Sequence, residues 1–508
     1  MVARVMTSAV IGVNGSLVEV ETDILNGLPS FTIVGLPDKA VEEARERVRS
    51  AIKNSGVDFP VKRITVNLAP SDLPKEGSSF DMPIAISILA ASEQVEGNID
   101  DALFIGELSL NGTFRLTRGV LPAILLAKSR NFKKVFVPYD NRFEASMVEG
   151  VDIYAVENLR DLLLFLDNKK DLEKIISVDF ENLQAESSYE YDLKDIRGQE
   201  IVKRAMEIAV AGGHNILLKG PPGSGKTLIA KTIPSLLPSL SFEEALEVTK
   251  IYSISGLLDG DKFMINRPFR SPHHTTSYVG LIGGSANPRP GEISLAHRGV
   301  LFLDEFPEFS RNVLESLRQP LEDGVVSISR ARHRVSYPAD FMLVAAANPC
   351  PCGYQGDSAR DCICTSHQIL RYQKRLSGPL LDRIDIHVDV PAVRTEKLMY
   401  DGEVEDSSAV RSRIDAALKV QRVRFSRVKT VMNGQMSARD IKEHIALSDE
   451  IKDLMRHASQ RLNLSARSFH KVLKVSRTIA DLDNNARNIE KVHVLEALQY
   501  RPRTDEGL

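Results

Sequence analysis

The chain has 508 residues, and at roughly 150 residues per domain this length suggests about three domains. Its composition, 43% hydrophobic and 26% charged, is typical of globular proteins and excludes a disordered or fibrous chain. The 65 basic and 68 acidic residues give a net charge of −3, so binding to nucleic acid would require a local basic patch. The sequence contains neither a membrane-spanning apolar run nor the apolar core of a signal peptide. We therefore expect a cytoplasmic protein with no membrane partner.

Four segments follow one another along the chain. Residues 1–167 alternate strand-like apolar runs with helical patterns, which predicts a compact α/β domain. Residues 168–194 are charged and lack a sustained period, which indicates a linker. Between residues 195 and 394, strand-like and helical patterns alternate and predict a parallel sheet with crossover helices. Residues 395–508 are predicted to be nearly all helical.

A phosphate-binding loop is the strongest short motif of the sequence. It follows an apolar strand-like run and precedes a helical pattern, which is the context that this motif requires. Its glycines let backbone N–H groups surround phosphates, Lys226 supplies a positive charge, and Thr227 supplies a hydroxyl ligand for Mg²⁺. The motif consists of Gly220, Pro221, Pro222, Gly223, Ser224, Gly225, Lys226 and Thr227. We therefore predict ATP and Mg²⁺ as cofactors.

Two later strand ends carry polar side chains suited to the same chemistry. One apolar run ends in Asp304 and Glu305, and we predict that Asp304 acts on Mg²⁺ while Glu305 polarises the attacking water. Another apolar run ends in Asn348, whose amide would orient that water from the neighbouring strand. A simple strand-capping role for Asn348 remains the alternative.

The four cysteines lie close together in the sequence, which is unusual for a disulfide-bonded protein and favours a metal site. They are Cys350, Cys352, Cys362 and Cys364. Four thiolates suffice for one tetrahedral Zn²⁺, and a site with no open position is structural rather than catalytic. His367 could replace one thiolate. The alternative is a set of four free cysteines.

Two basic segments are candidate nucleic-acid contacts. Arg330, Arg332 and Arg334 recur at every second position, so an extended strand would present all three on one face toward a phosphate backbone. The alternative is an exposed edge strand whose arginines prevent aggregation.

The second basic segment is a predicted amphipathic helix with a basic outer face. Its basic residues are Arg411, Arg413, Lys419, Arg422, Arg424, Arg427 and Lys429, against the single acid Asp415. The pattern leaves open whether this face meets solvent or DNA.

Longer motifs cover almost the whole chain and resemble those of magnesium-chelatase-like AAA+ ATPases, in particular the ComM/YifB family. Besides the phosphate-binding loop they are FRSPHHTTS at 269–277, PRPGEISLAHRGVLFLDEFPEF at 288–309, AAANPCPCG at 345–353, PLLDRIDIHV at 379–388 and LSARSFHKVLKVSRTIADL at 464–482. The resemblance implies that residues 195–394 form an AAA+ ATPase core and residues 395–508 a helical lid. It also implies a helix-2 insertion, a pre-sensor-1 hairpin carrying Arg330, Arg332 and Arg334, and the four-cysteine insertion within the core. The adjacent His273 and His274 in the helix-2 insertion are expected to pack or to face a pore.

The same resemblance assigns roles to three further side chains. Asn348 corresponds to the sensor-1 residue, Arg383 to the arginine finger, and Arg467 to the sensor-2 residue. An arginine finger acts only where a neighbouring subunit completes the site, so the family implies a ring, taken here as a homo-hexamer. From the residues alone, a salt bridge within the chain to Asp382 or Asp385 remains open for Arg383.

Residues 65–137 resemble the proteolytic domain of Lon, an S5 domain 2-like fold in which a Ser–Lys pair cleaves peptides. Ser79 falls at the position of the serine, but Leu121 falls at that of the lysine, and neither Lys75 nor Lys128 matches it. A serine without a base is a poor nucleophile near pH 7, so we expect a structural role for Ser79, with an ATP-dependent peptidase as the minor alternative.

The family resemblance implies an ATPase that translocates on branched or single-stranded DNA through the pore of its ring. It would promote branch migration when incoming DNA is recombined into the chromosome during natural transformation. The alternative is a chelatase-type ATPase that remodels a protein partner. Stimulation of the ATPase by DNA would separate the two.

Overall fold

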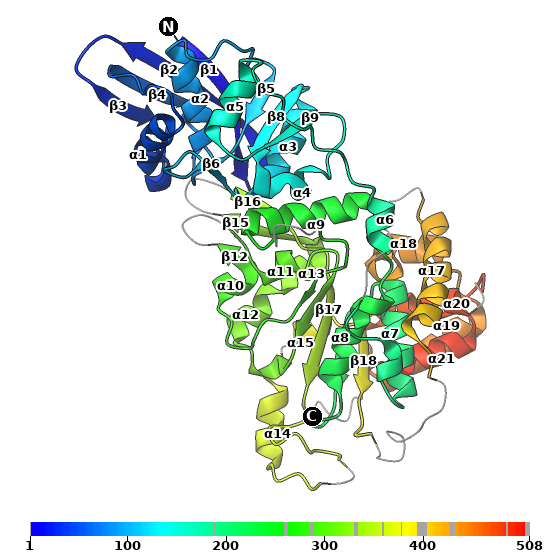
Figure 1. Cartoon of the computed structure of the whole chain (residues 1–508). Coiled ribbons are helices and arrows are strands. Elements are labelled where there is room, and N and C mark those ends of the chain that lie inside the picture. The colour runs from blue at the N-terminus through cyan, green and yellow to red at the C-terminus, as the bar shows by residue number, and fades with distance from the viewer. Residues whose placement is uncertain are drawn as a thin grey trace. The chain divides into compact units, whose positions relative to one another are not determined.

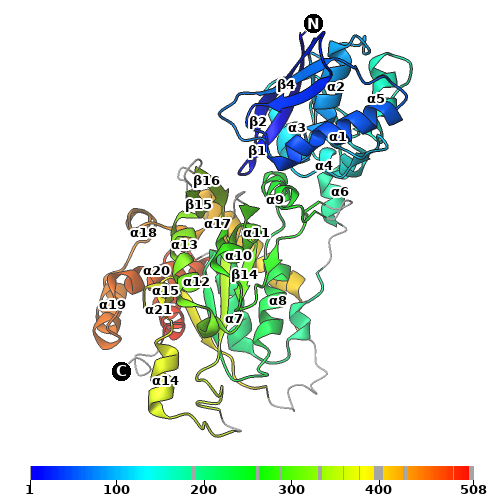
Figure 2. The ribbon, with the colours of Figure 1, turned by 90° about the vertical axis from the view of Figure 1, so that its left-hand side faces the viewer.

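The computed structural model describes residues 2–185, 189–258, 263–284, 289–329, 334–357, 360–376, 378–393, 404–426, 430, 432–483 and 486–502. The chain divides into two compact units (Figures 1 and 2). The first unit comprises Met1–Ala185, Ser241–Ile265 and Ser329–Tyr337, and the second comprises Glu186–Leu240, Asn266–Ile328 and Pro338–Leu508. Two short segments from the middle of the chain therefore belong to the N-terminal unit. Within the described residues, no helix is both long enough and apolar enough to cross a membrane.

The N-terminal unit is built on a mixed seven-stranded sheet with the order β3-β4-β2-β1-β5-β8-β9. The first two strands form a long antiparallel hairpin, whereas β5, β8 and β9 run parallel. The strands are β1 (Val2–Ile11), β2 (Asn14–Leu25), β3 (Ser30–Val34), β4 (Arg63–Ala69), β5 (Ala102–Phe104), β8 (Lys134–Pro138) and β9 (Asp152–Val156), with β6 (Glu107–Leu108) and β7 (Phe114–Arg115) as a separate pair. The helices are α1 (Lys39–Asn54), α2 (Asp81–Ala91), α3 (Val120–Ser129), α4 (Arg142–Ala145), α5 (Leu159–Leu166), α6 (Phe180–Ala185) and α9 (Phe242–Ser255), with a 3₁₀ turn at Tyr139–Asn141. This mixture of strands and helices confirms an α/β fold for the N-terminal part.

Local sequence signals set the ends of these helices. The carboxylate of Asp38 accepts a hydrogen bond from the backbone N–H of Val41 at 2.8 Å and so caps the start of α1. Val41, Val48 and Ile52 then recur at helical spacing and are buried. Helix α2 is instead buried around almost its whole surface, which makes it the central helix of this core.

The second unit contains a five-stranded parallel sheet with the order β11-β14-β17-β10-β18. Its strands are β10 (Ile216–Lys219), β11 (Phe269–Arg270), β14 (Val300–Leu303), β17 (Met342–Ala347) and β18 (Ile386–Asp389). The inner strands are continuous apolar runs because helices cover both faces of such a sheet. The predicted parallel sheet is confirmed, and β14 and β17 end where Asp304 and Asn348 begin.

Helices surround this sheet and make up the C-terminal part. They are α7 (Glu200–Gly212), α8 (Lys226–Leu236), α10 (Tyr278–Ile282), α11 (Glu292–Leu295), α12 (Arg311–Ser316), α13 (Arg318–Asp323), α14 (Ser366–Gln373), α15 (Gly378–Leu381), α17 (Ser407–Arg424), α18 (Ala438–His444), α19 (Asp449–Arg461), α20 (Ala466–Leu482) and α21 (Lys491–Gln499). Short 3₁₀ turns lie at Leu193–Asp195, Phe306–Glu308 and Asn433–Gln435. Two small strand pairs, β12 (Gly283–Gly284) with β13 (Arg289–Pro290) and β15 (Val325–Ser329) with β16 (Arg334–Pro338), complete the list.

Candidate nucleotide site

The loop between β10 and α8 has a backbone that only glycine accommodates easily. Gly223 and Gly225 adopt left-handed φ angles of 77° and 88°. A Cβ atom at Gly220 would lie 2.1 Å from the carbonyl oxygen of Val390, closer than any side chain allows. Helix α8 begins at Lys226, so the free N–H groups of its first turn come directly after this loop. The loop therefore has the form of a phosphate cradle.

Lys226 points back into the loop. Its Nζ donates to the backbone carbonyl oxygens of Gly220 and Pro221, each at 2.8 Å, and to Oδ1 of Asn348 at 3.2 Å. Burial lowers the pKa of Lys226, and the nearby Asp304 opposes this shift. The ammonium group is thus held by neutral oxygens, which a phosphate would outcompete because a charged acceptor makes the stronger hydrogen bond.

The two predicted Mg²⁺ ligands lie together. The Thr227 hydroxyl donates to Oδ2 of Asp304 at 2.8 Å. A hydroxyl and a carboxylate are both oxygen donors, the kind that Mg²⁺ prefers, so this pair fits the ion.

Glu305 is held in an unusual position by a residue that the sequence did not connect to it. Its φ of 50° is left-handed, which is uncommon for a residue with a side chain. Its Oε2 lies 3.0 Å from Nδ1 of His274. His274 follows β11, and β11 pairs directly with β14, the strand that precedes Glu305. The motif FRSPHHTTS, which begins on that strand, was the available signal.

A second cluster gathers Arg383, the predicted arginine finger, and Arg467, the predicted sensor-2 residue, around one carboxylate. Arg383 Nη2 donates to Glu322 Oε1 on α13, and Arg383 Nη1 donates to the carbonyl oxygen of Pro379 at 2.6 Å. Arg467 Nη2 lies 3.6 Å from the same Glu322 oxygen. The ion pair made by Arg383 within the described chain is thus with Glu322, not with Asp382 or Asp385. The structure places Arg383 and Arg467 together, and within the described residues no hydrogen bond or ion pair joins them to Lys226, Thr227 or Asp304.

A buried polar network ties the sheet to α20, the helix that carries Arg467. His214 Nδ1 lies 3.1 Å from Asp385 Oδ2, and His214 Nε2 lies 2.8 Å from the Thr478 hydroxyl. Lys471 Nζ lies 2.9 Å from the other Asp385 oxygen. Burial raises the pKa of Asp385, but Lys471 and His214 together lower it well below its usual value. Asp385 is therefore charged in the folded protein.

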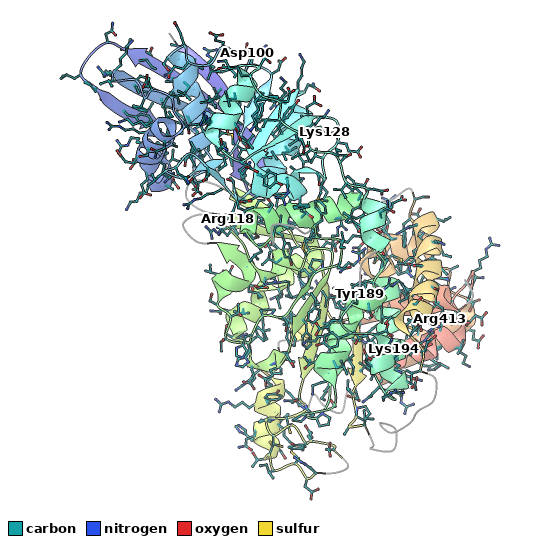
Figure 3. The ribbon with its side chains drawn as sticks, viewed as in Figure 1. Asp100, Arg118, Lys128, Tyr189, Lys194 and Arg413 are labelled. Carbon is teal, nitrogen blue, oxygen red and sulfur yellow. The ribbon has the colours of Figure 1, made fainter. Side chains whose placement is uncertain are left out.

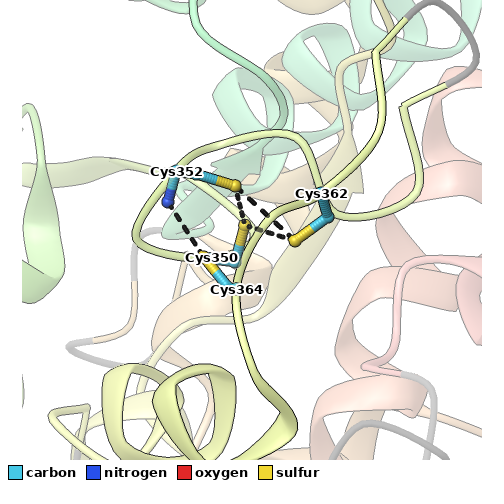
Figure 4. A group of neighbouring side chains, drawn as sticks. All are labelled: Cys350, Cys352, Cys362 and Cys364. Atoms are coloured by element: carbon cyan, nitrogen blue, oxygen red, sulfur yellow. Dashed lines mark hydrogen bonds between the residues drawn. The ribbon is translucent and has the colours of Figure 1, made fainter.

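The four cysteines form a compact group (Figure 4). Their Sγ atoms all lie within 4.8 Å of one another. The closest pairs are Cys350–Cys352 at 3.3 Å, Cys352–Cys362 at 3.5 Å and Cys350–Cys362 at 3.6 Å. Thiolates at the corners of a tetrahedron with Zn–S bonds of about 2.3 Å would be about 3.8 Å apart, so the residues fit a Zn²⁺ ion. His367 is not a member of this group and lines a groove described below.

The cysteine loop and the helix that follows it, α14, each contact the nucleotide site. A Cβ at Gly353 would lie 2.5 Å from Cδ of Pro222, so this loop packs on the phosphate-binding loop. Tyr372 on α14 is buried, and its hydroxyl accepts a hydrogen bond from the backbone N–H of Asn348. Burial raises the pKa of Tyr372 to about 12, so the hydroxyl is neutral. The loop and its helix thus bear directly on the residues around Lys226.

Of the three arginines predicted to contact DNA, one lies within the described residues. Arg334 is exposed at the start of β16, whereas Arg330 and Arg332 lie outside the described residues. Their role stays a prediction.

In the basic helix α17, several charges are bound within the protein. Arg411 donates to the carbonyl oxygen of Ser235 and lies over the ring of Tyr189, which Figure 3 labels. Arg413, also labelled there, pairs with Glu207 and Glu405. Arg424 pairs with the buried Asp481. The exposed Lys419 and Arg422 have no acidic partner among the described residues, while Arg427 and Lys429 lie outside them.

The position equivalent to the Lon lysine is occupied by a different arrangement. Leu121 is fully buried, and its backbone N–H donates to Glu144 Oε1 at 2.8 Å. Glu144 also accepts from the Ser253 hydroxyl of α9, and burial raises the pKa of Glu144. Within the described residues the Ser79 hydroxyl makes no hydrogen bond to a lysine. Lys75 instead donates to the carbonyl oxygen of Pro70.

The sheet order, the phosphate-binding loop and the acidic strand end are together those of a P-loop protein of the AAA+ type. The family model "Magnesium chelatase, subunit ChlI" matches residues 192–398, "Subunit ChlI of Mg-chelatase" matches 20–141, and "Magnesium chelatase, subunit ChlI C-terminal" matches 404–501. The chain is 45% identical to "Uncharacterized protein YifB" of Escherichia coli over 98% of this chain and 96% of that protein. It is 44% identical to "Competence protein ComM" of Haemophilus influenzae over 98% of this chain and 97% of that protein. The chain belongs to this magnesium-chelatase-like ComM/YifB family.

A more limited similarity connects the chain with Lon proteases. The chain is 28% identical to "Lon protease 2" of Bacillus subtilis over 30% of its own length and 31% of that protein. This likeness covers part of the chain only.

Proposed function

We propose that the protein is an ATP-hydrolysing motor that assembles as a homo-hexameric ring in the cytoplasm and translocates on branched or single-stranded DNA. Its task would be branch migration during the integration of incoming DNA in natural transformation. The observation that carries the ATPase assignment is the convergence of Lys226, Thr227, Asp304 and Asn348 at one edge of the parallel sheet. The DNA assignment is supported by the competence name of a relative that is similar along nearly its whole length.

The chain's own residues divide the work of hydrolysis. Bound ATP with Mg²⁺ supplies the phosphoryl group that is transferred to water. The ammonium of Lys226 binds phosphate oxygens, while Thr227 and Asp304 hold the metal. Glu305 accepts a hydrogen bond from the attacking water, and His274 keeps its carboxylate in place. Asn348 orients the same water from β17.

The remaining charged groups act between subunits. Arg383 is the arginine finger and Arg467 the sensor-2 residue, and each stabilises charge that develops on the phosphates. Both guanidinium groups lie beside the same Glu322 carboxylate, which supports the proposal that they act at one subunit interface. One structural Zn²⁺ on the four cysteines completes the cofactors.

The test is the rate of ATP hydrolysis with and without forked DNA. We expect forked DNA to raise the rate severalfold, and the Lys226→Ala variant to show no activity in either condition. Separation of a labelled strand from a branched substrate, dependent on ATP, would then establish branch migration. An ATPase that ignores every DNA structure but responds to a protein partner would instead establish the remodelling function.

A further inference from the structure

A groove of about 760 Å³ lies between α14 and the turn that follows the acidic end of β14. The charged residues that line it are Glu308, Arg311, His367, Arg371, Lys374 and Arg375. All six are exposed. Helix α14 projects from the second unit, where its label stands in Figures 1 and 2.

The groove carries an excess of positive charge that the described residues do not neutralise. Arg375 pairs with Glu308. Arg311, Arg371 and Lys374 have no acidic partner within the described part of the chain. Arg371 on α14 and Lys374, which directly follows the last helical residue with helical backbone angles, are three residues apart and so lie on the same side, where like charges repel. Such an arrangement is stabilised by a ligand that brings several negative charges.

The size of the groove limits the ligand. A volume of about 760 Å³ is that of a small-molecule pocket, so it accepts one extended backbone rather than the full width of a double helix. A nucleic-acid strand offers successive phosphates along one line, and arginine and lysine are the side chains that contact them.

The groove is connected to the nucleotide site through the buried side of α14. Tyr372 lies between Arg371 and Lys374 in the sequence, is buried, and accepts the hydrogen bond from Asn348. Asn348 in turn accepts from Lys226. A strand bound to the outer face of α14 would therefore be connected through Tyr372 and Asn348 to Lys226, the predicted phosphate-binding side chain.

We infer that the α14 groove binds the phosphate backbone of a single nucleic-acid strand, with Arg311, Arg371 and Lys374 as its contacts. This rests on the proposed DNA motor and names a surface by which that motor would hold its substrate. Helix α17 is less suited, because Arg411, Arg413 and Arg424 are bound within the protein.

The experiment measures binding of a fluorescent oligothymidylate to the full chain by anisotropy over a series of salt concentrations. The variant is Arg371→Ser with Lys374→Ser. Its matched control is Lys419→Ser with Arg422→Ser on α17, which removes the same charge from another exposed helix face. Unchanged zinc content and basal ATPase rate in both variants show that they fold.

We expect the α14 variant to bind about tenfold more weakly, and its slope of log affinity against log salt to flatten by about 1.4, or 0.7 for each lost phosphate contact. The α17 control should bind as the parent does. A parent that binds with a steep salt dependence, together with an α14 variant that is unchanged, would overturn the groove and leave the proposed function standing. A parent that binds no oligothymidylate but binds polyglutamate would overturn both, since the groove would then serve an acidic protein.

Discussion

At the scale of single residues, the arrangement around Glu305 separates nucleotide binding from hydrolysis. Lys226 contacts the loop that would hold the phosphates, while the Glu305 carboxylate, among the described residues, pairs with His274. Removing one function should therefore leave the other measurable.

We expect Glu305→Gln to bind ATP as tightly as the parent and to lose hydrolysis by a factor of roughly 10²–10⁴, because the amide orients water without accepting its proton. Lys226→Ala should lose both binding and hydrolysis. A fluorescent nucleotide measures the affinity, and release of phosphate measures the rate. Normal turnover by Glu305→Gln would contradict the role given to this carboxylate.

Asp385 is a second residue whose charge has a measurable consequence. In Asp385→Asn, Lys471 would remain buried without its partner, which costs ~3–5 kcal/mol of unfolding free energy at neutral pH. Since the folded-state pKa of Asp385 is lowered, its stabilisation is present above the unfolded pKa of about 3.9 and is lost as the pH falls through the folded value. Calorimetry should therefore show a deficit in Tm at pH 7, on the order of 10 °C, that shrinks below about pH 4. A deficit that is independent of pH would contradict the ion pair as its cause.

At the scale of elements, the cysteine loop and α14 depend on one another. Cys364 directly precedes Thr365, whose hydroxyl caps the start of α14, and Gly353 packs on Pro222 of the phosphate-binding loop. A metal ion held by the four cysteines would therefore fix both α14 and one wall of the nucleotide site.

We expect the purified protein to contain close to one Zn²⁺ per chain and Cys352→Ser to lose it, because three thiolates leave the tetrahedron incomplete. Since the binding free energy of a structural metal contributes to folding, the variant should also melt earlier and bind ATP more weakly. His367→Ala is the matched control and should keep its zinc. Metal analysis of protein prepared without chelators measures the zinc content per chain. A parent protein without zinc would contradict the proposed metal site.

The sequence predicted elements better than it predicted contacts between them. The phosphate-binding loop, the strand ends at Asp304 and Asn348 and the cysteine group depend on residues close in the sequence, and local patterns were enough to find them. The pairing of His274 with Glu305 depends on β11 lying beside β14, which periodicity does not encode. Helix α17 shows the same limit of sequence-based prediction. Its spacing predicted a charged outer face, but whether Arg413 meets solvent or Glu207 depends on the packing of α17 on α7.

At the scale of the whole molecule, the residues proposed for the site fall into two halves, and no hydrogen bond or ion pair joins these halves within the described residues. Lys226, Thr227, Asp304 and Glu305 form one half, and Arg383 with Arg467 forms the other. Glu322 neutralises both arginines in the single chain, and an arginine that pairs with a carboxylate is a suitable donor to a phosphate that replaces it.

We expect Arg383→Ala to abolish hydrolysis while leaving the affinity for ATP nearly unchanged, because the guanidinium acts on charge that develops in the transition state. Mixing Arg383→Ala with Glu305→Gln subunits is the decisive measurement. An interface between the two variants can bring an intact Glu305 from one subunit to an intact Arg383 from the other, so the mixture should recover part of the parental rate although each variant alone is inactive. The recovery should depend on the mixing ratio and vanish when the Arg383→Ala subunit also carries Lys226→Ala, because that subunit supplies the nucleotide site of the hybrid interface. The same change in the Glu305→Gln subunit, which supplies only Arg383, should leave the recovery in place. An absence of recovery at every ratio, in subunits shown to exchange, would count against action of Arg383 on a neighbouring subunit.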